Sequence, residues 1–167
     1  MVIYVPIHLR SLGYSWEELG RIFTVMLLPF LMIQYPLGIL ADKKTGEKEL
    51  IIASIVIISV STGAIYLIGT GSAALWATVL FITRIGASAI EVMRDSYFFK
   101  KVDSDDVDMI DFFRTASSAG YIAAALSSTL LLLFFPIEAV FLMIGVVAAS
   151  ALWPAFRMID NKAECEK

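Results

Sequence analysis

Ionisable residues inside long apolar segments are the residues of this chain whose chemistry stands out. Four lie in the apolar segment 73–98 and two open the segment 109–135: Arg84, Glu91, Arg94, Asp95, Asp111 and Arg114. Each such group costs about 2.5–3.5 kcal/mol when it is placed in hydrocarbon. We therefore expect these side chains to face protein or a water-filled cavity.

The spacing along segment 73–98 suggests different roles for these groups. Arg84 lies about 17 Å into the segment by helical rise, near the middle of a bilayer. No carboxylate stands within four residues of it, so Arg84 is a candidate contact for a substrate or an anion. Glu91 lies two turns further along nearly the same face, within reach of Arg94 and Asp95.

Two interpretations of Glu91 remain open. It either forms a permanent ion pair with Arg94 or gains and loses a proton as the protein changes state. Burial favours the neutral acid and nearby arginines favour the carboxylate, so the sequence does not decide between them. Towards the inner surface we expect an ion-pair network made by Arg94, Asp95, Asp111 and Arg114.

The segments that must position these groups are typical of a membrane protein. Hydrophobic residues make up 59% of the chain and charged residues only 17%, against about 25% charged in soluble domains. A bilayer core of about 30 Å needs roughly 20 apolar residues in a helix. Five segments meet that length: 20–41, 49–69, 73–98, 109–135 and 137–157. We predict an all-α, polytopic transmembrane helix bundle over 1–160, followed by a cytoplasmic tail at 161–167.

The first nine residues are apolar but too short to cross a bilayer. They are either an arm at the membrane interface or the outer end of a further helix, and we favour the helix. Tyr4 then lies near the outer mouth of the bundle. His8 is expected at the interface, because side chains with polar aromatic tips favour that depth.

Helix boundaries are marked by polar residues and prolines. Ser15 and Glu18 form a capping-box pattern, and Ser72 and the 108–111 segment offer N-caps for the next helices. Pro136 predicts a tight hairpin between two apolar runs. Pro29 and Pro36 predict a bent helix with freed carbonyl groups.

Lysine and arginine near the ends of the segments predict the orientation. If the loop after residue 41 is cytoplasmic, eight of them lie inside: Lys43, Lys44, Lys48, Lys100, Lys101, Arg157, Lys162 and Lys167. Only Arg10 and Arg21 then lie outside. We expect a cytoplasmic C-terminus and a location in the inner (plasma) membrane of a prokaryotic cell.

Small residues recur every four positions in segment 109–135: Ala116, Gly120, Ala124 and Ser128. Such a stripe lets helix backbones approach closely in lipid. Ser117 and Tyr121 beside it give the same helix a polar side. By contrast, residues 50–69 and 139–156 carry no charge, which suits helices on the lipid-facing outside of the bundle.

The loop after segment 20–41 carries a family signature. Gly38, Asp42, Lys43 and Lys48 match the glycine, aspartate and basic positions of G-x-x-x-D-[RK]-x-G-[RK]-[RK], with Gly46 one residue late. Glu47 departs from the pattern, because a basic residue is usual there. The chain thereby resembles the major facilitator superfamily (MFS), as one six-helix half with the first helix incomplete. Arg84-Ile85-Gly86 and Phe112-Phe113-Arg114 resemble the fourth and fifth helices of a C-terminal half.

This resemblance implies a secondary active transporter, a symporter or antiporter, that works by alternating access. It implies partners in membrane lipid, a small-molecule substrate with or without a coupled proton, and the N-terminal half of the transporter. Asp42 would be a gating contact in the loop. The pathway residues would be Arg84, Glu91, Gln34, Tyr35, Tyr4, Ser117 and Tyr121.

Other functional classes fit less well. A helical membrane scaffold or dimer-forming protein that moves no solute is the main alternative. An intramembrane enzyme is disfavoured because H-E-x-x-H and G-x-S-x-G are absent and His8 and Cys165 stand at opposite ends of the chain. We expect no catalytic residue, no metal site and no cofactor. The scattered lysines and arginines form no nucleic-acid face.

Overall fold

The computed structural model describes residues 3–40, 47–69, 71–102 and 106–158, and within these ranges the chain is helical without strands. The helices are α1 (Tyr4–Ser11), α2 (Trp16–Leu40), α3 (Glu47–Leu67), α4 (Ala73–Phe99), α5 (Val107–Leu132), α6 (Glu138–Ser150) and α7 (Leu152–Arg157). Helices α2 to α5, and α6 together with α7, are long and apolar enough to cross a membrane. The predicted all-α transmembrane bundle is therefore confirmed.

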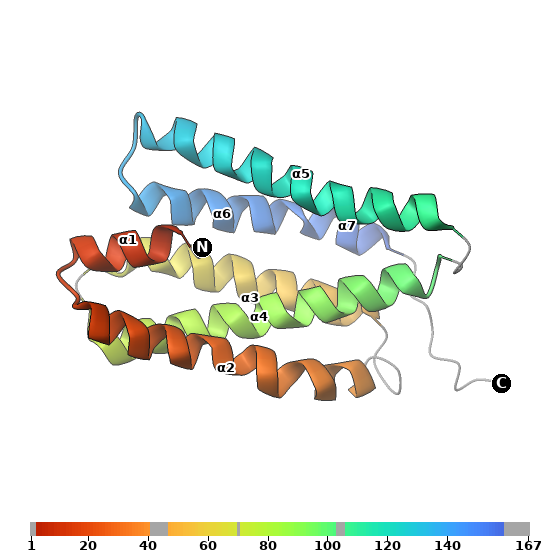
Figure 1. The fold of residues 1–167 in the computed structure, drawn as a ribbon, viewed down its shortest axis with the longest axis horizontal. Helices are drawn as coiled ribbons and strands as arrows, with labels where there is room; N and C mark the ends of the chain where they lie inside the picture. Colours follow the sequence, from red (N-terminus) through yellow and green to blue (C-terminus); the bar gives the residue numbers. More distant parts are fainter. Residues whose placement is uncertain (1–2, 41–46, 70, 103–105, 159–167) are drawn as a thin grey trace.

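The long helices run side by side and alternate in direction (Figure 1). Helix α4 packs against α2 and α3, and α3 also packs against α6. Helix α5 lies along α6 at one edge of the bundle, and the short α1 lies between the α5–α6 pair and the α2–α4 pair (Figure 1).

Two glycines let α3 come close to its neighbours. A Cβ atom on Gly86 of α4 would stand 2.8 Å from Ile58 Cγ1 and 3.0 Å from the carbonyl oxygen of Ser54. A Cβ atom on Gly145 of α6 would stand 3.2 Å from the carbonyl oxygen of Ser59. Backbone contact of this kind replaces hydrophobic burial as the attraction between helices in lipid.

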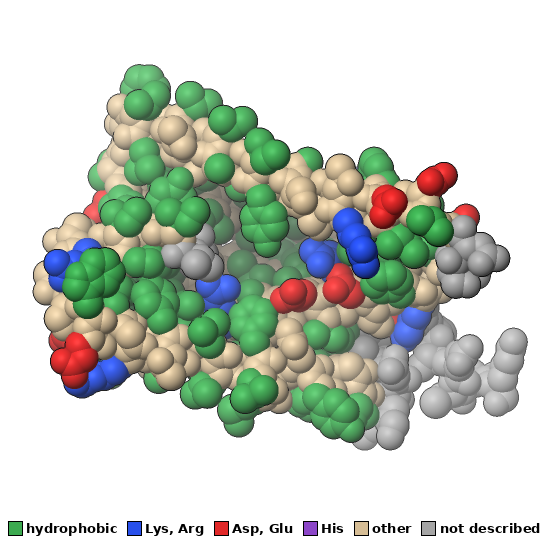
Figure 2. All heavy atoms as spheres, in the orientation of Figure 1, with side chains coloured by type: hydrophobic (Ala, Val, Ile, Leu, Met, Phe, Trp, Pro, Cys, Tyr) green, Lys and Arg blue, Asp and Glu red, His purple; other side chains and the backbone are tan. Residues whose placement is uncertain are grey.

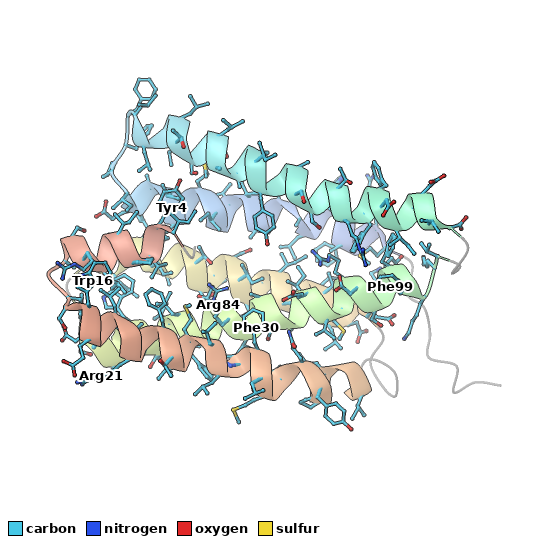
Figure 3. The ribbon with its side chains drawn as sticks, in the orientation of Figure 1. Tyr4, Trp16, Arg21, Phe30, Arg84 and Phe99 are labelled. Atoms are coloured by element: carbon cyan, nitrogen blue, oxygen red, sulfur yellow. The ribbon has the colours of Figure 1, made fainter. Side chains whose placement is uncertain are left out.

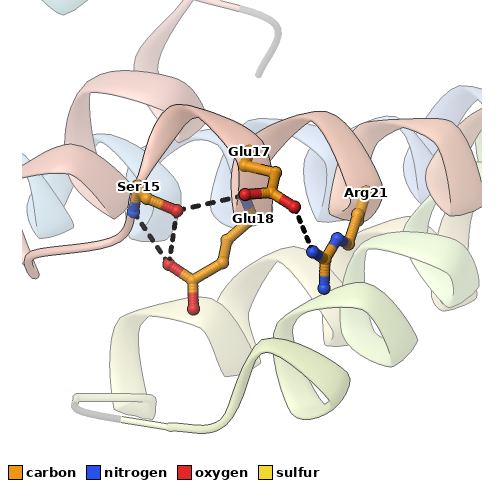
Figure 4. Close-up of polar contacts among 4 residues, drawn as sticks. All are labelled: Ser15, Glu17, Glu18 and Arg21. Atoms are coloured by element: carbon orange, nitrogen blue, oxygen red, sulfur yellow. Dashed lines mark hydrogen bonds and ion pairs between the residues drawn. The ribbon is translucent and has the colours of Figure 1, made fainter.

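The capping box predicted at the start of α2 is present (Figure 4). The Ser15 backbone N–H donates to Glu18 Oε2 over 2.8 Å, and the Glu18 N–H donates to Ser15 Oγ over 3.3 Å. Two otherwise unpaired N–H groups at the helix end are thereby satisfied. Just before it, Gly13 has a φ of 94°, a left-handed conformation that turns the chain from α1 into α2.

Of the other predicted helix boundaries, the cap of α4 is confirmed and the caps of α5 are wrong. Ser72 caps α4 by accepting a hydrogen bond from the Leu75 N–H. The caps expected at Asp108 and Asp111 are wrong, because α5 begins at Val107 after Asp106 and both aspartates lie within its first turns. Helix α2 continues through both of its prolines.

The segment 137–157 is divided where one continuous helix was expected. Helix α6 ends at Ser150 and α7 starts at Leu152. Pro154 has no N–H to donate to the carbonyl of Ser150, and its ring crowds that carbonyl, so the α-helical ladder is interrupted there.

Candidate functional site

A cavity of about 350 Å³ opens where α1, α4, α5 and α6 face one another. It lies on the face shown in Figure 2, which is hollowed between the helices and carries charged side chains along the hollow. Most of the residues around the cavity are apolar or hydroxyl-bearing, and one is cationic: Ile3, Tyr4, Arg84, Tyr121, Ala124, Ala125, Ser128, Met143 and Ile144. Three residues predicted for the pathway, Arg84, Tyr4 and Tyr121, thus line the same cavity.

Arg84 is half-buried on α4 and extends toward the centre of the bundle (Figure 3). Its guanidinium carbon lies 5.8 Å from the centre of the Phe30 ring of α2, within cation–π distance. Among the described residues it has no hydrogen-bond acceptor and no carboxylate partner. Arg84 therefore presents hydrogen-bond donors and positive charge to the cavity.

A hydrogen bond between Tyr4 and Ser128 bounds the cavity between α1 and α5. Their oxygens are 2.6 Å apart, and Ser128 Oγ also lies 2.7 Å from the carbonyl oxygen of Ala124. Ser128 has a single proton, which it donates to the carbonyl of its own helix, so Tyr4 is the donor in the contact between the helices. This bond fixes the start of α1 against α5.

The charged residues in the C-terminal part of α4 do not form the expected ion pair between Glu91 and Arg94. Arg94 donates from Nε and a terminal nitrogen to Asp95 Oδ1 over 3.0 and 2.8 Å, and its guanidinium also lies 5.1 Å from the Phe113 ring centre. Glu91 is exposed and has no ion-pair partner among the described residues. The permanent Glu91–Arg94 pair is thus not formed, because Arg94 turns toward its neighbour and toward α5.

The remaining pathway and network residues lie outside this cavity. Gln34 is half-buried and Tyr35 is 79% exposed, both on α2. Ser117 donates a hydrogen bond of 3.4 Å to the carbonyl of Phe113 in its own helix. Asp111 and Arg114 are exposed and make no ion pair within the described part of the chain. Their roles in transport or in a network stay predictions.

The signature loop is described only at its two ends. Asp42, Lys43 and Gly46 lie outside the described residues. Gly38 lies near the end of α2, where a Cβ atom would meet no neighbour within 4 Å. Lys48 lies in the first turn of α3.

Glu47, which departs from the signature, is a buried charge that sequence reasoning did not single out. Its side chain is 0% exposed, and its Oε1 atom lies 2.6 Å from Lys100 Nζ and 3.1 Å from Ser96 Oγ, both from the far end of α4. The sequence offered one signal, an acidic residue at the first position of a helix, where the dipole favours it.

His8 is buried, contrary to the expected position at the interface. It is 1% exposed, and its ring meets Trp76 of α4 and Phe141 of α6 edge-on at 5.5 and 5.4 Å. Its Nδ1 atom lies 3.6 Å from Glu138 Oε1. Helix α1 is therefore packed into the bundle by Val5, His8 and Leu9 and is no surface arm.

The fold and the cavity together define an integral membrane protein with a mostly apolar cavity between its helices, to which Arg84 adds a positive charge. The sequence relationship makes this assignment specific. The chain belongs to the Major Facilitator Superfamily, whose family model matches residues 1–164. It is thus a membrane transporter of that superfamily. Comparison with curated proteins and with solved structures gives no match.

Proposed function

We propose that the chain forms one half, the C-terminal one, of a secondary active transporter that moves a small solute by alternating access. In this superfamily two six-helix halves rock about a site near the middle of the membrane. The observation that carries the proposal is Arg84, an arginine without a carboxylate partner among the described residues, in a cavity between α1, α4, α5 and α6. Such a costly group inside a membrane bundle is expected to serve function.

The face of α5 supports a second half as partner. Large apolar side chains are strongly exposed on opposite sides of this helix: Phe112 at 71% and Leu130 at 62% on one side, and Tyr121, beside the cavity, at 79% on the other. The stripe of small residues runs along the same helix, and Gly120 has no neighbour within 4 Å of a Cβ atom placed on it. A second six-helix half would cover the side of α5 that bears the small-residue stripe and Tyr121, and the smooth stripe would let the halves slide.

The direct test is solute uptake by vesicles that contain the complete transporter, with and without a proton gradient. A transporter is expected to accumulate at least one solute, and dependence on the gradient identifies proton coupling. Insertion into the membrane without uptake of any solute would favour the non-transporting scaffold. The proposal fails in that case.

The signature loop gives a sharper prediction. Asp42→Ala is expected to reduce uptake without reducing insertion, because a gating contact stabilises one of two conformations. Loss of about 1.4 kcal/mol from such a contact changes their ratio about tenfold. Uptake per inserted molecule is the measurement, and Asp106→Ala, outside the signature, is the control. Equal uptake by the wild type and Asp42→Ala would remove the gating role.

A further inference from the structure

The cavity beside Arg84 has a charge and a shape that together select a class of ligand. Its volume of about 350 Å³ is near the lower end of the usual range for small-molecule sites. Of its nine lining residues, Arg84 is the only one with a formal charge. A ligand that matches this cavity is therefore small and carries one negative charge.

The surroundings of Arg84 favour a carboxylate over other anions. Phe30 contacts the guanidinium as an aromatic ring, which attracts the cation but accepts no ordinary hydrogen bond. The planar guanidinium fork matches the two oxygens of a carboxylate. A group with two negative charges would need a second cation, and the next arginine along α4, Arg94, is paired with Asp95.

The rest of the cavity suits an apolar ligand body. Ala124 and Ala125 of α5 leave space, and Met143 and Ile144 of α6 supply an apolar wall opposite. Methionine adapts well to aromatic rings and irregular shapes. Tyr121, whose side chain is 79% exposed, stands at the edge of the cavity and offers a second aromatic surface.

We propose that the substrate is a small monocarboxylate with an apolar, ring-containing body. Its carboxylate binds Arg84 in a bidentate fashion, and its body lies between Ala124 of α5 and Met143 of α6. This assignment rests on the proposed transport function, because it takes the cavity to be the substrate site.

The test measures binding of two probes that differ only in charge. Naphthalene-1-carboxylate and its neutral amide, naphthalene-1-carboxamide, are titrated calorimetrically into the full-length protein in lipid nanodiscs, with empty nanodiscs as background. The carboxylate is expected to bind at least about tenfold more tightly, since a charge-assisted pair replaces a neutral contact. Equal affinities, or no binding of either probe, would overturn the proposal.

Variants locate the preference on Arg84. Arg84→Gln is expected to abolish the preference for the carboxylate, and Arg84→Lys to retain part of it. Arg10→Gln, which removes an exposed arginine at the end of α1, is the matched control and should leave both affinities unchanged. Ala124→Phe fills the cavity while keeping the charge and should weaken both probes. If Arg84→Gln still bound the carboxylate more tightly than the amide, Arg84 would not be the group that binds the carboxylate.

Comparing this binding measurement with the uptake measurement separates the ligand class from the transport function. Binding is measured without a gradient, so carboxylate binding without any solute uptake would keep the site and remove transport. Uptake restricted to neutral or cationic solutes would keep transport and remove the carboxylate assignment.

Discussion

Two ionisable residues of this bundle, Arg84 and Glu47, have contrasting surroundings. Arg84 faces a cavity without a carboxylate partner among the described residues, whereas Glu47 is fully buried and paired with Lys100. The sequence identifies Arg84 because its cost in an apolar segment is a local property. It does not identify Glu47, whose partner is provided by a helix end more than fifty residues away.

The Glu47–Lys100 pair should respond unequally to removal of either partner. Lys100→Met leaves a fully buried carboxylate without this cation and is expected to lower the free energy of unfolding by about 3 kcal/mol. Glu47→Gln leaves Lys100, whose side chain is 40% exposed and can be hydrated, and should cost about 1 kcal/mol. Unfolding by sodium dodecyl sulfate in mixed micelles measures both.

Lys101→Met is the control for this pair. Lys101 donates to the hydroxyl of Tyr97 over 2.7 Å at an exposed position, so its loss should change stability by less than about 0.5 kcal/mol. If Lys100→Met proved no more harmful than Lys101→Met, the pair would not stabilise the N-terminal end of α3 against α4.

At the scale of elements, two glycines outside the predicted small-residue stripe make close helix contacts. Gly86 and Gly145 bring α4 and α6 against the backbone of α3. In the stripe, Ser128 bonds to Tyr4 and Ala124 lines the cavity, while Gly120 meets no atom within 4 Å of a Cβ position. A stripe of small residues thus indicates where another helix can approach α5 closely. The packing of this stripe against a second half stays a prediction.

Alanine substitutions at the two glycines should have opposite effects. Gly86→Ala places a Cβ atom 3.0 Å from the Ser54 carbonyl oxygen, which is backbone and yields little, so a loss of about 1–3 kcal/mol is expected. Gly120→Ala meets no atom within 4 Å and gains up to about 1 kcal/mol from helix propensity. Thermal unfolding in detergent compares them. A stabilising Gly86→Ala would contradict the close contact of α3 with α4.

For the whole molecule, most of α5 and the cavity beside Arg84 are uncovered in the described part of the chain. Apolar exposure along α5 and the cationic cavity lie on neighbouring parts of the same side (Figures 1 and 2). Lipid covers exposed apolar side chains in a membrane, but a cavity that contains Arg84 needs water, substrate or protein.

The predicted orientation can be checked with the single cysteine, Cys165. A membrane-impermeant maleimide should label it only after the cells are permeabilised, because lysine-rich loops stay cytoplasmic and place the C-terminus with them. Ser11→Cys in a Cys165→Ser background, at the exposed end of α1, should be labelled in intact cells. The reverse pattern would invert the orientation.

The sequence by itself determined which segments are helices long enough to span a membrane, where α2 and α4 are capped, and the family. These are local properties, since every backbone group in lipid must be satisfied within its own helix and each ionisable residue bears its own cost. Only the tertiary structure decided that Tyr4 and Tyr121 join Arg84, that Glu47 pairs with Lys100, and that His8 is buried. Those contacts depend on how helices distant in sequence rotate and cross. A helix that is apolar on nearly all sides carries no periodic pattern to fix that rotation.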